Sequence, residues 1–210
     1  MQLEPEVQES IDALVEGFVG LPSPELNELV VTSYSEKNRH YHTVHHLDWL
    51  YKVAIKWKKA LFTDEEWKIL CGAILFHDII YNAKREDNEK QSATIARTWI
   101  NNNLTGYGII LRNVERLILD MDEPGVSFLN DFFQDIDMSI LGGAGSLYPE
   151  YQEAVRKEYS TAFTPEQYNM GRKSFLVKLL RRKSIFRTNI FFLELEQNAI
   201  RNIAAEIASL

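Results

Sequence analysis

Apolar residues recur at intervals of three and four positions along almost the whole chain, and this spacing restricts the possible fold more than any other feature. It places apolar side chains on one face of a helix, whereas a half-buried strand needs alternating apolar and polar residues, and no sustained alternation occurs. Three helix starts carry capping patterns: Ser23-Pro24, Thr164-Pro165, and Thr63 with Glu66. The sequence therefore predicts an all-α protein.

The same patterns give the extent of each expected helix to within about two to four residues. Helices are expected to start near residues 24, 64 and 165, and to span about 42–59, 64–80, 87–102, 107–120, 129–141, 149–160, 165–183 and 189–208. Gly142-Gly143 is expected to end a helix, and Asp122 to Gly125 is expected to form an exposed loop. A chain of 210 residues without a linker or an internal repeat predicts one domain.

Composition excludes several classes of protein. The single cysteine, Cys71, has no partner for a disulfide or a CxxC metal site, which favours a reducing compartment. A formal charge of −7 opposes binding to nucleic acid or to an anionic membrane. The first ten residues are acidic and polar, and the apolar runs are too short to cross a bilayer. We therefore expect a cytoplasmic protein with no nucleic-acid or membrane partner.

Histidines cluster in one short segment. Four of the five lie between His40 and His46. Because His42 and His46 are four residues apart, they would share one face of a helix and could point at one site. Any one of these histidines alone would be interpreted as a surface or half-buried imidazole, but a second motif changes that interpretation.

The second motif is His77-Asp78, which interrupts an apolar run from Ile74 to Ile80. Burying a carboxylate costs several kcal/mol unless it is paired or binds a metal. Asp78 could pair with an arginine such as Arg39 or cap a helix, but imidazole with carboxylate is also a donor set that suits Mn, Fe, Zn or Ni. The motif therefore indicates a candidate metal site.

An antiparallel hairpin of the helices at 42–59 and 64–80 would bring the two motifs together. The start of the first helix would then lie beside the end of the second. Counting from the turn places His46 level with His77 and His42 about one turn beyond. Counting alone does not choose between His42 and His46.

Further motifs accompany these two along the chain. The full set comprises Tyr34, Arg39 to His42 with His46, Phe76 to Tyr81, Asp87-Asn88-Glu89 with Ser92-Ala93, Asp135 to Gly142, Tyr148 to Tyr151, Arg156 to Tyr159, Gly171-Arg172 and Glu196 to Glu206. Together they resemble the predicted metal-dependent phosphohydrolases of the HD superfamily. The resemblance implies one HD-domain helical bundle over 1–210, with a metal-site core at about 34–142 and a C-terminal helical extension at about 146–210.

The resemblance also implies one divalent metal ion, which could be Mn, Fe, Co, Ni, Zn or Mg. Its ligands would be His42, His77, Asp78 and Asp137, with His46 as the alternative to His42. Many apparent relatives carry a Thr-x-x-His segment where this chain reads Asp120-Met121-Asp122-Glu123-Pro124, and no histidine follows His77. Because dinuclear HD enzymes typically take extra histidines from this part of the chain, we expect a mononuclear site.

Helix neighbours favour Asp137 over Asp135 as the last ligand. On a helix Asp137 would have apolar neighbours, namely Phe133, Ile140 and Leu141. Asp135 would instead be flanked by Asp131, Met138 and Ser139. We therefore expect Asp137 to face the interior and Asp135 to support the site from outside the ligand set.

The metal would act as a Lewis acid on a phosphoryl group, with Asp78 central to catalysis. Asp87 and Glu89 are candidates for the catalytic base or for support of the metal ligands, and a solvated helix start is an equal alternative. Asn88 would support the ligands or bind substrate. Arg39 is the first candidate to bind the phosphate, because its planar guanidinium suits two oxygens, but it could equally brace Asp78 or Asp135. The basic residues between Lys178 and Arg187 are interpreted first as a solvated face.

The expected activity is hydrolysis of a small phosphorylated metabolite, and by family analogy of a nucleotide. The alternative is a noncatalytic HD module that binds a nucleotide or a metal as a sensor. The missing Thr-x-x-His segment favours this alternative.

Overall fold

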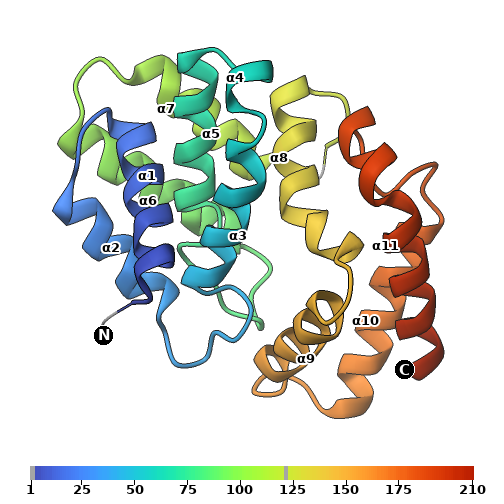
Figure 1. Ribbon diagram of the computed structural model, residues 1–210. Helices are drawn as coiled ribbons and strands as arrows, with labels where there is room; N and C mark the ends of the chain where they lie inside the picture. The colour runs from blue at the N-terminus through green and yellow to red at the C-terminus, as the bar shows by residue number, and fades with distance from the viewer. Residues whose placement is uncertain (1–2, 121–122) are drawn as a thin grey trace. The chain divides into compact units, whose positions relative to one another are not determined.

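The computed structural model describes residues 3–120 and 123–210 (Figure 1). The regular elements in this part of the chain are all helices, which confirms the all-α prediction. Of the expected loop from Asp122 to Gly125, residues 123–125 are exposed as predicted, whereas Asp122 lies outside the described residues. In the described ranges no helix is both long and apolar enough to cross a membrane.

The chain divides into two compact units, Met1–Glu123 and Pro124–Leu210. We expected one domain with a core extending to about residue 142, and the observed division falls earlier. The reason lies within the second unit, where residues 128–142 pack on the C-terminal helices. The Asn202 side chain, for example, donates to the carbonyl oxygens of Leu141 and Gly143, at 2.8 and 2.9 Å.

The first unit contains seven helices in its described residues: α1 (Pro5–Val19), α2 (Pro24–Tyr34), α3 (Val44–Ile55), α4 (Lys58–Leu61), α5 (Asp64–Phe76), α6 (Asn88–Asn103) and α7 (Gly108–Leu119). Helix α5 is the central one, because α1, α3, α6 and α7 all pack against it. Its residues from Ile69 to Phe76 are all buried. Gly72 allows the close approach of α1 and α7, since a Cβ there would lie 2.8 Å from the Phe18 ring and 2.9 Å from Val114.

The second unit contains α8 (Phe128–Met138), the 3-10 helix η1 (Ser139–Gly142), α9 (Leu147–Tyr159), α10 (Pro165–Leu180) and α11 (Asn189–Ser209). A buried polar network joins α9, α10 and α11. Arg172 donates from Nε and Nη2 to Glu206, at 2.8 and 3.1 Å, and from Nη1 to the Tyr151 hydroxyl at 3.0 Å. Tyr148 also donates to Glu206.

The predicted helix starts at residues 24, 64 and 165 are confirmed. Ser23 accepts a hydrogen bond from the Leu26 amide, and capping boxes form at Thr63 and Thr164. The helix α1 was not predicted.

The two helices expected to carry the metal site are shorter than predicted. The segment expected at 42–59 begins as a helix only at Val44, with Thr43 as its N-cap, and a break after Ile55 separates α3 from α4. The segment expected at 64–80 ends at Phe76, so that His77 and Asp78 follow the helix. The prediction that His42 and His46 share one helix is therefore wrong, because His42 precedes α3.

Candidate metal site

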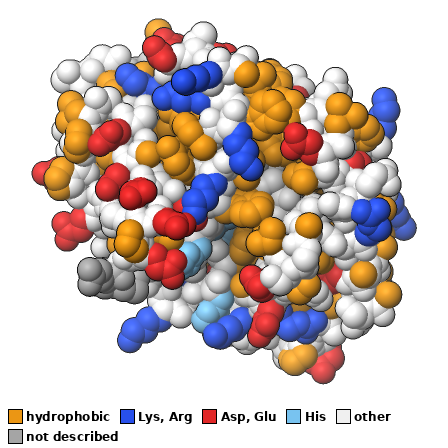
Figure 2. All heavy atoms as spheres, in the orientation of Figure 1, with side chains coloured by type: hydrophobic (Ala, Val, Ile, Leu, Met, Phe, Trp, Pro, Cys, Tyr) orange, Lys and Arg blue, Asp and Glu red, His pale blue; other side chains and the backbone are white. Residues whose placement is uncertain are grey.

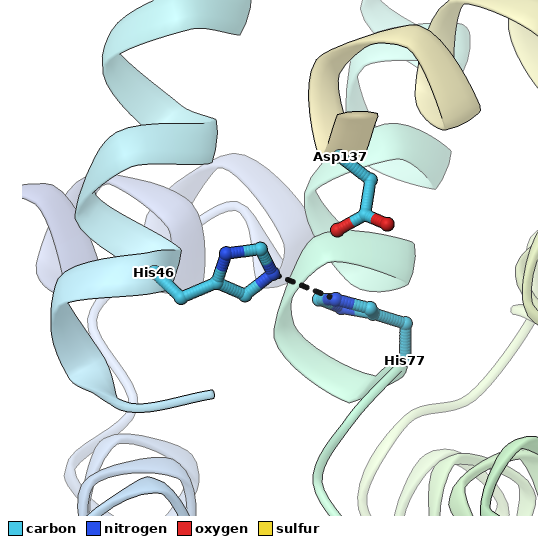
Figure 3. A group of neighbouring side chains, drawn as sticks. All are labelled: His46, His77 and Asp137. Atoms are coloured by element: carbon cyan, nitrogen blue, oxygen red, sulfur yellow. Dashed lines mark hydrogen bonds between the residues drawn. The ribbon is translucent and has the colours of Figure 1, made fainter. Parts of the chain in front are cut away.

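The first turn of α3 meets the end of α5 through two histidines. His46 lies in that first turn, and His77 is the C-cap residue of α5. Both side chains are buried, and their Nε2 atoms are 3.3 Å apart (Figure 3). The start of one helix thus lies beside the end of the other, as the antiparallel hairpin predicted, and His46 is level with His77.

A hydrogen bond to the main chain fixes the orientation of the His77 ring. Its Nδ1 lies 2.9 Å from the carbonyl oxygen of Ile74, which can only accept a hydrogen bond. Nδ1 therefore carries a proton, and Nε2 is the ring atom left to bind a metal. Nε2 of His77 lies 3.3 Å from Nε2 of His46 and 3.2 Å from Oδ2 of Asp78.

His42 reaches the same carboxylate from the segment before α3. Its Nε2 is 3.7 Å from Oδ2 of Asp78, and the two side chains are 18% and 16% exposed. Histidine side chains also reach the surface on the face drawn in Figure 2. With these exposed fractions, the His42 and Asp78 side chains are both partly open to solvent. The structure brings both His42 and His46 to the His-Asp pair, so both alternatives for the first histidine ligand stay open.

The charge of Asp78 is set by two opposing effects. Burial raises the pKa of Asp78, but the neighbouring His77, His42 and His46 side chains lower it by more, so that the net pKa lies well below the ordinary value for an aspartate. The carboxylate is ionised at neutral pH. An anionic oxygen beside imidazole nitrogens is a suitable donor set for a transition-metal cation.

Two of the donor separations match those between ligands of one ion. Ligand atoms that are each about 2.0–2.2 Å from a metal lie about 3 Å from one another at tetrahedral or octahedral angles. The observed separations are 3.3 Å between the two Nε2 atoms of His46 and His77 and 3.2 Å between His77 Nε2 and Asp78 Oδ2. Nε2 of His77 thus lies at a ligand-to-ligand distance from both His46 and Asp78.

Two tyrosines beside the histidines were not predicted as site residues. The Tyr81 ring stacks on His42 at a centroid distance of 4.0 Å, and the Tyr41 ring lies 4.8 Å from His42 and 5.0 Å from His46. Both tyrosines lie in non-helical segments, where helical spacing gives no information on which way a side chain points. Their adjacency to the histidine and His-Asp motifs was the one available signal.

Arg39 does not fit the predicted role of phosphate ligand. Its side chain is 0% exposed, and it donates to the carbonyl oxygens of Asp78 at 2.6 Å and Ile79 at 2.9 Å. It also pairs with Glu36 at 3.0 Å. A guanidinium held in this way cannot reach a substrate, so the prediction is corrected: Arg39 binds main chain at the end of α5.

The segment that precedes α6 also has local roles. Asp87 pairs with Arg85 at 2.7 Å, and Arg85 and then Gln91 lower the pKa of the Asp87 carboxyl, which makes Asp87 a poorer base. The side-chain amide of Asn88 forms two hydrogen bonds of 3.0 Å with the main chain of Asn82. Glu89, in the first turn of α6, is exposed.

Asp135 was predicted to lie on the less buried face of its helix, and this prediction is wrong. This residue is 1% exposed, whereas Asp137 is only partly buried. The Asp135 carboxylate accepts hydrogen bonds from the Arg187 amide at 2.8 Å and from the amide and hydroxyl of Thr188, both at 2.7 Å. It satisfies amide groups at the start of α11, where a helix has no internal acceptors. Asp135 is therefore a structural residue of the second unit.

Comparison of this chain with protein-family models, with curated proteins and with solved structures finds no match. Without a match, the chain is classed by its own structure: it is an all-α protein in which two histidines and an aspartate lie close together at the end of α5.

Proposed function

We propose that this chain is a metal-dependent phosphohydrolase of the HD type, acting on a small phosphorylated metabolite, preferably a nucleotide. The observation that carries the proposal is the position of His77 Nε2, which lies 3.3 Å from Nε2 of His46 and 3.2 Å from Oδ2 of Asp78, with Nε2 of His42 3.7 Å from the same carboxylate oxygen. A merely structural histidine pair would not need an ionised carboxylate next to it. A cation explains all of these donors together.

The proposed ligands are one or both of His42 and His46, together with His77, Asp78 and Asp137. Figure 3 draws His46, His77 and Asp137, whose nitrogen and carboxylate donors suit a divalent transition metal. Asp137 belongs to the second unit, and its role rests on the chemistry of its carboxylate and on the HD resemblance. One such ion per chain would polarise a phosphoryl oxygen and lower the pKa of bound water.

The remaining proposed roles belong to side chains near the start of α6. Since the pKa of Asp87 is lowered by its ion pair with Arg85, Glu89 is the better candidate for the base that accepts a proton from water. The ionised Asp78 would hold the cation, and the hydrogen bond from His77 to Ile74 would keep the Nε2 of His77 available for it.

A second candidate function is a noncatalytic sensor that binds a metal or a nucleotide. It is favoured by the absence of any histidine after His77, where dinuclear enzymes of the HD type take further ligands. The two candidates use the same site residues, and only the enzyme turns over a substrate.

The test combines metal analysis with a screen of phosphorylated metabolites in the presence of Mn, Mg, Co and Ni. We expect one tightly bound metal per chain and hydrolysis of a phosphate ester. Asp78→Ala and His46→Ala should lose metal and activity, whereas His45→Ala, which changes the exposed neighbour of His46, should retain both. Full metal occupancy without hydrolysis would favour the sensor, and an Asp78→Ala variant with unchanged metal content would refute the site.

A further inference from the structure

The main chain that follows α5 is held by one buried guanidinium. Arg39 donates to the carbonyl oxygens of Asp78 at 2.6 Å, Ile79 at 2.9 Å and His42 at 3.3 Å. These carbonyls belong to the segment before α3 and the segment after α5. One side chain therefore ties together the two segments that carry His42 and Asp78.

Tyr34 holds the same peptide from its other end. Its hydroxyl accepts a hydrogen bond from the Asp78 amide at 3.2 Å, and its ring lies 5.0 Å from the Arg39 guanidinium carbon. Tyr34 is 0% exposed. Both the amide and the carbonyl of Asp78 thus have buried side-chain partners, which fix the position of its Cα.

These contacts replace the hydrogen bonds that a helix would supply. Because α5 ends at Phe76, the carbonyls of Asp78 and Ile79 have no helical partner and would be costly to bury alone. Arg39 satisfies both carbonyls, and its own atoms are not among the donor atoms of the candidate metal site. The planar guanidinium can bond several carbonyls at once, which a lysine ammonium on a flexible stem does less well.

We propose that Arg39, with Tyr34, is a positioning residue that sets the separation of His42 and Asp78 for metal binding. The inference rests on the proposed metal site and deepens it. It states that metal affinity depends on Arg39, although Arg39 contacts main-chain carbonyls and none of the proposed ligand atoms. A side chain that only stabilised the fold would change the unfolding temperature without changing the coordination of the ion.

The test uses Co²⁺ as the probe, since its visible spectrum reports coordination geometry directly. Arg39→Lys keeps the positive charge but loses the planar fork, and we expect its affinity for Co²⁺ to fall by about 10- to 100-fold, as is usual when a partner behind a ligand is removed. The Co²⁺ spectrum should shift. Arg97→Lys is the control, because Arg97 is an exposed residue that pairs with Glu115 on α7, and its affinity and spectrum should match wild type.

A second variant keeps the test decisive if Arg39→Lys does not fold. Tyr34→Phe removes only the hydroxyl that accepts from Asp78, and we expect a loss of about tenfold in Co²⁺ affinity with the circular dichroism spectrum unchanged. If the folded variants bind Co²⁺ with wild-type affinity and spectrum while Asp78→Ala does not bind, the positioning role is overturned and the metal site stands. If wild-type protein binds no Co²⁺, the metal site and the positioning role are both overturned.

Discussion

At the scale of single residues, the chemistry of the site depends on which ring nitrogen carries a proton. The Ile74 carbonyl accepts a hydrogen bond from Nδ1 of His77, so Nε2 is the ring atom left to bind a metal, and it lies 3.3 Å from Nε2 of His46. A metal bound at the two Nε2 atoms would compete with protons for them. Metal affinity should therefore fall at acidic pH, where histidine side chains become protonated.

Two neighbouring carboxylates at the start of α6 allow a matched pair of substitutions. Glu89→Gln should lower turnover by about a hundredfold, because an amide keeps the shape of the side chain but cannot accept a proton. Metal content should not change. Asp87→Asn should have a much smaller effect, since Asp87 is engaged by Arg85. Steady-state kinetics with metal analysis would check both, and equal turnover in the Glu89→Gln and wild-type proteins would exclude Glu89 as the base.

At the scale of elements, local signals predicted where helices start but not where the site helices end. The capping contacts of Thr63 and Thr164 lie within three residues, so the sequence contains all the information needed. The main chain after α5 is bound by Arg39, which precedes the carbonyls it binds by 39 and 40 residues. Periodicity cannot predict a contact of that separation.

The candidate site shows the same division. The meeting of His46 with His77 was predicted, because the hairpin of two helices relates their positions by simple counting. The burial of Asp135 was not, because its partners Arg187 and Thr188 lie 52 and 53 residues away in the sequence. The sequence identified the neighbours of Asp135 on its own helix, but not the distant segment that buries it.

The close packing of α5 gives a stability prediction. Gly72→Ala should lower the free energy of unfolding by about 1–3 kcal/mol, because the new Cβ would lie under 3.0 Å from Phe18 and Val114. Gly108→Ala is the control in the same unit, since a Cβ there meets nothing within 4 Å, and we expect a change within about 0.5 kcal/mol. Urea unfolding would measure both, and equal effects would contradict this account of the packing.

The tyrosines of the second unit give a pH prediction. Burial raises the pKa of Tyr168 to about 12, above its unfolded value near 10. The unfolded state therefore loses its proton first, and the contribution of Tyr168 to stability is complete below pH 10 and is lost as the pH rises through about 12. Tyr168→Phe should reduce the loss of stability between pH 9 and pH 11, measured by guanidinium unfolding. Its stability at pH 7 should change little, because the buried hydroxyl has no hydrogen-bond partner among the described residues.

At the scale of the whole molecule, the chain has two compact units, Met1–Glu123 and Pro124–Leu210. Each unit has its own buried interior, with α5 central to the first and the network of Arg172 and Glu206 joining the helices of the second. The proposed ligands do not follow this division, because Asp137 comes from the second unit and the others come from the first.

The contribution of the second unit to the proposed site can therefore be measured with one substitution and one fragment. Asp137→Asn keeps the size of the side chain but removes its charge, and we expect it to lower the affinity for Co²⁺ or Zn²⁺ by about 100-fold, since the loss of a ligand should cost at least as much as the loss of a partner behind one. The fragment 1–123, once circular dichroism shows that its helices form, should bind the metal as weakly as Asp137→Asn, because it retains His42, His46, His77 and Asp78 but lacks Asp137.

Asp131→Asn is the control on the same helix, where the carboxylate pairs with Arg187 at 3.5 Å, and its metal affinity should equal that of wild type. Wild-type affinity in Asp137→Asn would show that the first unit supplies every protein ligand, and a further loss in the fragment would point to a second contribution from residues 124–210.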